Sequence, residues 1–293
     1  MRQQRYTRTG ARRAGDDYQD LVAVGLATEM LSHPMRYTWM ELEADAVGAL
    51  DDVVLLHNEG HLVLRQVKFS TNPRRPNDDW TLDALLSKKT EQSKSLLQKW
   101  TQSVGQALQR SAQVGDGNLD AAIITNRRLG DDLQSAIIVG YLDIHRLGDA
   151  CLDRICQQVS LDEFEALCRI VRWDTDWPDY GELEALRRKR FLQLGGSNEG
   201  WLSIRSSIRD WVRVRDEPQP NGHITVQHLR SVALWHRLES VPQGFEVPRD
   251  FVLPSDGFHE DLMLRILDQN TSFIVVTGSP GVGKSTCLSY LTN

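Results

Sequence analysis

The chain has 293 residues, 40% of them hydrophobic and 25% charged, with a formal net charge of −6. This is an ordinary globular composition with ample core, and the length suits two domains. No apolar stretch approaches membrane-spanning length and no signal-peptide core begins the chain, so we expect a cytoplasmic protein without a membrane partner. The acidic net charge leaves nucleic-acid binding open, because the clustering of basic residues decides it.

The first 15 residues carry five arginines and no acid. They are typical either of an arm that contacts phosphates or of a solvated terminus. A helix is expected next, because apolar residues recur on one helical face from Leu21 to Leu31, and Asp16 or Asp17 would cap it.

Residues 37–43 (YTWMELE) predict a first strand, and two apolar runs of strand length follow it at 50–56 and 62–69. The polar, glycine-bearing residues 57–61 separate the runs, so the pair predicts a β-hairpin. Both runs are apolar at nearly every position rather than at alternate positions. This indicates two strands inside a sheet that is covered on both faces.

Three polar residues interrupt the apolar hairpin, and a loop of residues 57–61 brings them together. In that register Asp52 lies directly opposite Gln66, and Lys68 lies on the same face, diagonal to Asp52 and roughly 7 Å away between β-carbons. A slip of one residue would put Asp51 opposite Gln66 instead, so Asp51 is the alternative carboxylate.

This group of side chains has the chemistry to hydrolyse a phosphodiester. The Asp52 carboxylate and the Gln66 carbonyl are hard oxygen ligands that suit Mg²⁺ or Mn²⁺, and Lys68 would orient or deprotonate the attacking water. Glu41 and Glu43, near the end of the first strand, are possible further ligands, although acids at strand ends are usually solvated. The plainer interpretation is a structural Asp–Lys pair on a strand.

An Asp followed, after a hairpin turn, by a strand-borne Gln-x-Lys resembles the PD-(D/E)xK, restriction-endonuclease-like superfamily. Gln66 stands where most members have Glu or Asp, and Gln-x-Lys also occurs in active Mrr-like members. The segments GARRAGDDYQD, ELEAD, DDVVL, LRQVKFS and AAIITNR (121–127) resemble the nuclease domain of bacterial antiviral effectors, which are Mrr-like double-stranded-DNA endonucleases. The resemblance covers about the first 130 residues, and Tyr18-Gln19 matches the family's aromatic residue and Glu before the hairpin.

The resemblance implies an α/β fold with a mixed sheet flanked by helices, and residues 121–127 would add a core strand beside the hairpin. Residues 81–113 predict one long helix, or two, between the third and fourth strands. From 130 to 215 the pattern is mainly helical, with amphipathic segments at 161–171 and 180–194, and we interpret it as a helical elaboration of the nuclease.

Residues 201–215 (WLSIRSSIRDWVRVR) place Arg205, Arg209 and Arg213 four residues apart on one helical face. Such a stripe suits either a phosphate backbone or a solvated face with i,i+4 pairing. The basic run 187–190 (RRKR) has the same two interpretations. The composition of 216–222 (DEPQPNG) is that of a linker, which leads into a connector that extends to 254 and contains a helix around Leu229.

The last residues match GxxxxGKS after an apolar strand at 272–276. Backbone N–H groups of such a loop surround phosphates, Lys284 would reach the β- and γ-phosphates of ATP, and Ser285 would coordinate Mg²⁺. The predicted nucleotide-binding residues are Gly278, Gly281, Gly283, Lys284, Ser285 and Thr286. We therefore divide the chain into a nuclease domain (1–215), a connector (216–254) and the start of a P-loop NTPase domain (255–293).

A nuclease joined to this loop resembles the bacterial STAND-type antiviral NTPases, in which an effector, a nucleotide switch and a sensor for an invader protein share one chain and oligomerise on activation. The resemblance implies a metal-dependent endonuclease that cuts double-stranded DNA under the control of the NTPase. Three alternatives stay open: an inactive DNA-binding or oligomerising module, an activity that resides in the NTPase alone, and a nuclease that acts on RNA or single-stranded DNA.

Overall fold

The apolar runs on either side of residues 57–61 form a β-hairpin, as predicted. In the computed structural model, which describes residues 7–75, 78–213 and 222–239, the hairpin consists of β2 (Val53–His57) and β3 (Leu62–Lys68). Leu56 pairs with Leu62 and Val54 with Leu64, which is the predicted register. The hairpin is inside the sheet, and core side chains cover it on both faces.

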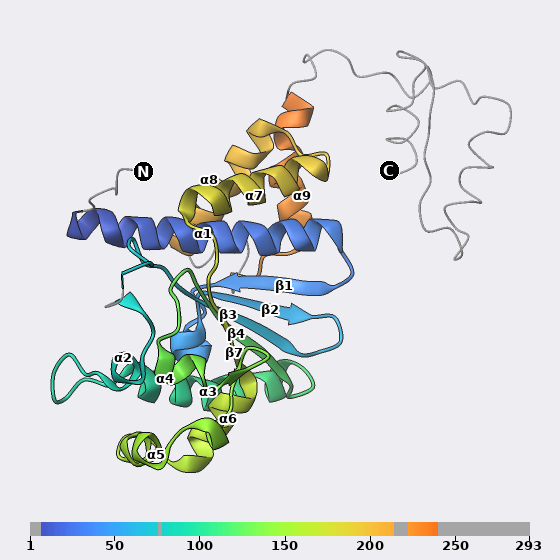
Figure 1. Cartoon of the computed structure of the whole chain (residues 1–293). Coiled ribbons are helices and arrows are strands. Elements are labelled where there is room, and N and C mark those ends of the chain that lie inside the picture. The colour runs from blue at the N-terminus through green and yellow to red at the C-terminus, as the bar shows by residue number, and fades with distance from the viewer. Residues whose placement is uncertain (1–6, 76–77, 214–221, 240–293) are drawn as a thin grey trace, which may run out of the picture. The chain divides into compact units, whose positions relative to one another are not determined.

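The described residues form an α/β fold with a seven-stranded mixed sheet in the order β1-β2-β3-β4-β7-β6-β5 (Figure 1). β1 (Tyr37–Leu42) is antiparallel to β2, whereas β4 (Leu119–Thr125) is parallel to β3. The strand β7 (Val171–Asp174) is parallel to β4, and the short strands β6 (Tyr141–Leu142) and β5 (Ile137–Ile138) complete the sheet. The predicted core strand at 121–127 is therefore confirmed as β4 (Leu119–Thr125), the neighbour of the hairpin.

One face of the sheet packs against helices that lie between β1 and β7 in the chain. Its core includes three indoles, Trp80, Trp100 and Trp173, whose ring centroids are 5.7 to 5.9 Å apart. Residues 81–113 form two helices between β3 and β4, which agrees with the prediction. The elements of this layer are η1 (Asp45–Leu50), α2 (Leu82–Leu86), α3 (Leu96–Val114), α4 (Asp131–Gln134), η3 (Ile144–Arg146), α5 (Asp149–Cys156) and α6 (Leu161–Ile170).

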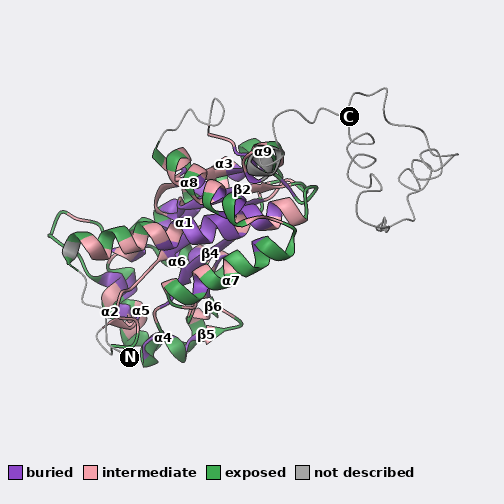
Figure 2. Cartoon of the chain, turned by 90° about the horizontal axis from the view of Figure 1, so that it is seen from above, coloured by how far each residue is buried: buried purple, intermediate pink, exposed green. Residues whose placement is uncertain are grey.

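The other face of the sheet packs against α1 (Arg8–Ser32), α7 (Tyr180–Gln193), α8 (Asn198–Arg213) and α9 (Val226–Glu239). Figure 2 shows α1 as the most deeply buried helix of this layer. Within the predicted connector, Ile224 exchanges two backbone hydrogen bonds with Met40 of β1, and Leu229 of α9 is fully buried. Ile224, Leu229 and Ala233 therefore pack in the same core as α1.

One local prediction was wrong. The first helix begins at Arg8, because the Thr7 hydroxyl accepts a hydrogen bond from Gly10 N at 3.0 Å and caps it there, so neither Asp16 nor Asp17 is the cap. The region 130–215 is mainly helical, as predicted, but it also contributes the short strands β5, β6 and, directly after α6, β7. That strand has four residues and follows directly on α6, so its short apolar run looked like the end of the amphipathic helix.

The predicted P-loop segment lies outside the described residues, together with the strand expected at 272–276 and most of the connector. None of the described helices combines the length and the apolar character that crossing a membrane requires.

Candidate active site

Asp52 immediately precedes β2, and it is held against β3 by two hydrogen bonds to one carboxylate oxygen. The backbone N–H of Val67 donates to Oδ2 at 2.6 Å, and the Gln66 side-chain amide donates to the same oxygen. Asp52 is 7% exposed and Gln66 is 1% exposed. The hairpin register therefore brings together the carboxylate and the amide that the sequence predicted to face each other.

Burial raises the pKa of Asp52 to about 7. The Lys68 ammonium and the Val67 N–H oppose this shift, whereas the carboxylates of Glu43 and Asp51 add to it. Ionising this carboxylate is unfavourable because it is buried and because two other acids repel its charge. A cation bound beside it would offset both effects.

Three carboxylates gather at the start of β2. One oxygen from each of Glu43, Asp51 and Asp52 lies within 4.8 Å of the others. Glu43 follows β1 with φ at 51°, a left-handed conformation that a residue with a long side chain rarely adopts. Such strain is frequent at functional sites, where surrounding contacts hold it in place. Burial raises the pKa of Asp51 too, and the nearby Glu43 carboxylate contributes to that shift.

Helix α1 supplies a further polar group to this cluster. Tyr18 is fully buried, stacks on Phe69 just after β3 with 4.6 Å between ring centroids, and donates a hydrogen bond to Pro178 O at 2.9 Å. These contacts place the next residue, Gln19, so that its amide donates to Glu43 Oε1 at 2.5 Å. The sequence marked Tyr18-Gln19 only through its resemblance to a family motif, and it did not predict the pairing of Gln19 with Glu43.

Lys68 is half-buried at the end of β3 and acts electrostatically on both Asp51 and Asp52. Within the described part of the chain, its ammonium forms no hydrogen bond or salt bridge. The ammonium is therefore available to a water molecule or to a phosphate group.

The Gln66 carbonyl supports the assignment of a metal site. Its Oε1 is buried and has no hydrogen-bond partner among the described residues. A buried oxygen without a partner usually costs free energy, and a bound ion is one of the few groups that can satisfy it. With the three carboxylates this oxygen would make an all-oxygen ligand set, the kind that suits Mg²⁺ or Mn²⁺.

The structure separates the candidate ligands that the sequence left open. Asp51 and Glu43 lie in the carboxylate cluster with Asp52. Glu41 instead forms a salt bridge with Arg110 of α3, whose guanidinium also lies over the Trp39 ring. The strand-end position alone did not distinguish the two glutamates, because the left-handed turn at Glu43 is a tertiary feature.

The arginine stripe of α8 is mostly engaged within the protein. Arg205 pairs with Glu184 and donates to the Tyr180 hydroxyl at 3.0 Å. Arg209 pairs with Asp17 and, at 3.0 Å, with Asp20 of α1. Arg213 is 68% exposed and lies 3.9 Å from Asp210, one turn earlier. Two of the three guanidinium groups thus fix α8 to α7 and α1, and only Arg213 stands largely in solvent.

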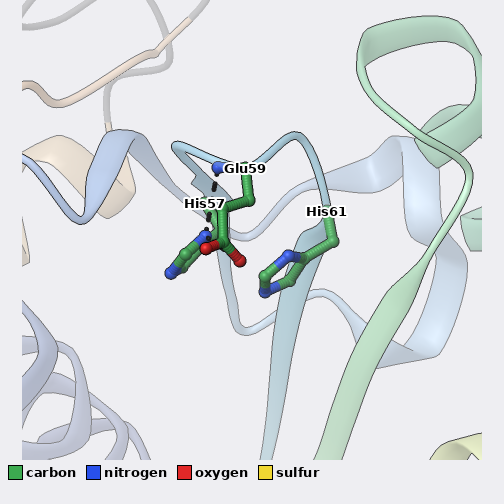
Figure 3. Close-up of side chains that lie close together, drawn as sticks. All are labelled: His57, Glu59 and His61. Carbon is green, nitrogen blue, oxygen red and sulfur yellow. Dashed lines mark hydrogen bonds and ion pairs between the residues drawn. The ribbon is translucent and has the colours of Figure 1, made fainter.

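A second group of possible metal ligands lies at the opposite end of the hairpin (Figure 3). Ligand atoms of His57, Glu59 and His61 lie within 4.8 Å of one another, and the two imidazole rings stack with 4.2 Å between centroids. The side chain of Glu59 is 79% exposed. Stacked rings direct their nitrogen lone pairs in parallel rather than toward one point, so this cluster is less suited to a metal ion than the carboxylate cluster.

Comparison with models of known protein families gives no match, and no curated protein is significantly similar to the chain.

The raised pKa of Asp52 predicts how the stability of the metal-free protein depends on pH. The folded pKa is about 7, above the ordinary value of 3.8, so the folded state holds the proton over a pH range in which the unfolded state has lost it. The bound proton contributes fully to the stability of the folded state below about pH 4, and this contribution is lost as the pH rises through 7. Between pH 5 and pH 8 we expect wild type to lose about 2–3 kcal/mol of unfolding free energy relative to Asp52→Asn.

Urea denaturation of both proteins in EDTA at the two pH values measures this difference. A constant difference between wild type and Asp52→Asn would show that Asp52 is ionised at pH 5 as well as at pH 8.

Proposed function

We propose that the chain is a metal-dependent endonuclease that hydrolyses phosphodiester bonds in double-stranded DNA, and that its sheet is of the restriction-endonuclease-like type. The observation that carries the proposal is the buried, unpartnered Oε1 of Gln66 beside three gathered carboxylates. A purely structural Asp–Lys pair would leave two features unexplained: the unpartnered Gln66 oxygen and the left-handed backbone of Glu43.

In this proposal Asp52, Gln66 and the flanking acids hold Mg²⁺ or Mn²⁺, which supplies Lewis-acid chemistry at the scissile phosphate. The Val67 N–H fixes the Asp52 carboxylate so that its second oxygen is directed away from that hydrogen bond. Lys68, with no competing partner among the described residues, orients or deprotonates the attacking water.

A pair of exposed arginines supports a polyanionic substrate. Arg12 and Arg13 are exposed on α1 and precede Gln19 by seven and six residues, so their backbone lies roughly 10 Å along the helix axis from Gln19, which contacts the carboxylate cluster. Figure 1 shows this first part of α1 on the side of the sheet where β2 begins and β3 ends. Duplex DNA is preferred because the motifs around Asp52 and Lys68 resemble those of Mrr-like nucleases.

We further propose that Gly278, Gly281, Gly283, Lys284, Ser285 and Thr286 bind ATP as part of a STAND-type switch that controls the nuclease. In that arrangement nucleotide binding and oligomerisation regulate access to DNA in antiviral defence, and an invader protein is the trigger.

The direct test is incubation of the protein with supercoiled plasmid, with Mg²⁺, with Mn²⁺ or with EDTA. We expect nicked and linear DNA in either metal and intact plasmid in EDTA. Matched single-stranded DNA and RNA substrates in the same assay distinguish the alternative nucleases. Metal-independent retention of plasmid without cleavage, in protein activated with ATP, would instead support a DNA-binding module.

A further inference from the structure

A cavity of about 390 Å³ lies between α1, α7 and the sheet. It is lined by Arg65 of β3, and neighbouring strand residues point to opposite faces, so it lies across the sheet from Gln66 and Lys68. Its volume is within the range of small-molecule sites in proteins. The cavity is therefore separate from the carboxylate cluster of the proposed nuclease.

The positive and negative charges of the aspartates, glutamate and arginines that line the cavity nearly cancel. Its three acids each pair with an arginine at 2.5 to 3.1 Å: Glu29 with Arg36, Asp120 with Arg65, and Asp174 with Arg172. The fourth arginine of the lining, Arg187 of α7, forms no ion pair within the described residues. One positive charge in the cavity wall is thus left without a counter-ion.

Arg187 is held in place although it has no acidic partner. Its guanidinium lies 5.3 Å from the centroid of the Trp177 ring, and a β-carbon added at Gly25 of α1 would lie 2.6 Å from its Nε. That Nε is buried and has no hydrogen-bond partner among the described residues. Burial also lowers the pKa of Arg187. A desolvated, unpaired guanidinium costs free energy unless an acceptor reaches it.

A second unpartnered donor belongs to Arg172, which also lines the cavity. The Nε of Arg172 is buried and without a hydrogen bond in the described structure, although its Nη2 pairs with Asp174. The stacked rings of His57 and His61 also line the cavity, and Figure 3 shows them side by side at the hairpin turn. A guanidinium offers donors and no acceptor, so the ligand that satisfies both arginines must bring acceptor oxygens and negative charge.

We propose that this cavity binds a small phosphate-bearing molecule, with Arg187 and Arg172 donating to its phosphate oxygens. A phosphate has oxygens on several sides and can accept from guanidinium groups on different walls, whereas a carboxylate presents two oxygens in one plane. The cavity, at about 390 Å³, has room for a free phosphate or a mononucleotide, and a nucleic-acid duplex is too large to enter it. The proposal does not depend on nuclease activity.

The test combines isothermal titration calorimetry with thermal denaturation. Wild type and Lys284→Ala are titrated with inorganic phosphate, with AMP and with dAMP in EDTA, so that binding at the glycine-rich loop is separated from binding in the cavity. We expect saturable binding in both proteins and, at ten times Kd, a rise in Tm of about 3–6 °C. Tighter binding of the nucleotides than of phosphate identifies a nucleotide ligand, and equal binding identifies phosphate itself.

Arg187→Gln and Arg172→Gln are each expected to weaken binding at least tenfold, and Lys189→Gln, an exposed neighbour on α7, is the matched control that leaves it unchanged. The apo Tm of Arg187→Gln should not fall, because the substitution removes a half-buried charge that has no ion pair among the described residues. The proposal is overturned if wild type shows no saturable binding, if sodium chloride at equal ionic strength gives the same shift, or if Arg187→Gln binds as tightly as wild type.

Discussion

Replacing Asp52 by asparagine is expected to abolish metal-dependent DNA cleavage, with a loss of at least about a thousandfold, while the metal-free protein becomes more stable. The loss follows because asparagine lacks the negative charge with which the Asp52 carboxylate would hold Mg²⁺, and the metal contributes several kcal/mol to stabilising the charge that develops on the phosphate. The gain in stability follows because burial penalises the ionised carboxylate, which raises its pKa to about 7.

Asparagine has nearly the size of aspartate and keeps one oxygen that can accept from the Val67 N–H. The substitution therefore changes the charge more than the packing. Plasmid cleavage and isothermal titration with Mn²⁺ measure the two losses, and urea denaturation in EDTA at pH 8 measures the gain. Asp153→Asn on the exposed side of α5 is the control, with no expected change in any of the three. Full cleavage by Asp52→Asn would show that the hairpin is only a scaffold.

The hairpin was predictable because its information is local. Two apolar runs and a five-residue polar loop determine the register, and the register brings Asp52 next to Gln66. Alternation along β3 then places Lys68 on the same face. None of these steps depends on which helices pack on the sheet.

Two members of the carboxylate cluster depend on long-range structure. Glu43 reaches the cluster through a left-handed turn, and Gln19 reaches Glu43 because Tyr18 packs on Phe69. The sequence offered both only as candidates from their position or family resemblance, since no periodicity encodes a single left-handed residue or a contact between α1 and β1.

The partners of the arginines were likewise not predictable from the sequence. An arginine stripe looks identical in sequence whether it faces solvent or acids on another helix, and the acids that engage Arg205 and Arg209 lie on α7 and α1. Conversely, Arg187 belongs to a basic run that suggested only a phosphate contact or a solvated face. Its neighbours Lys189 and Arg190 are exposed, whereas Arg187 lines a cavity.

Replacing Lys68 by alanine is expected to lower the cleavage rate by a factor of about 10²–10⁴, the usual contribution of a positioned acid–base group, while Mn²⁺ binding persists. The ammonium has no partner within the described residues and is not a metal ligand, so its removal should spare the ligand set. Its loss removes the opposing charge beside Asp52, which should raise the pKa of that carboxyl further. Metal binding should then weaken modestly and recover at higher pH.

This combination separates the two roles in the proposed site. Asp52→Asn should lose both metal and cleavage, whereas Lys68→Ala should lose cleavage at saturating Mn²⁺ and pH 8. Lys89→Ala, which removes an exposed ammonium between α2 and α3, is the matched control for lost positive charge and should cleave like wild type. Equal cleavage by Lys68→Ala and wild type under saturating metal would remove Lys68 from the chemistry and would leave water activation to the carboxylates alone.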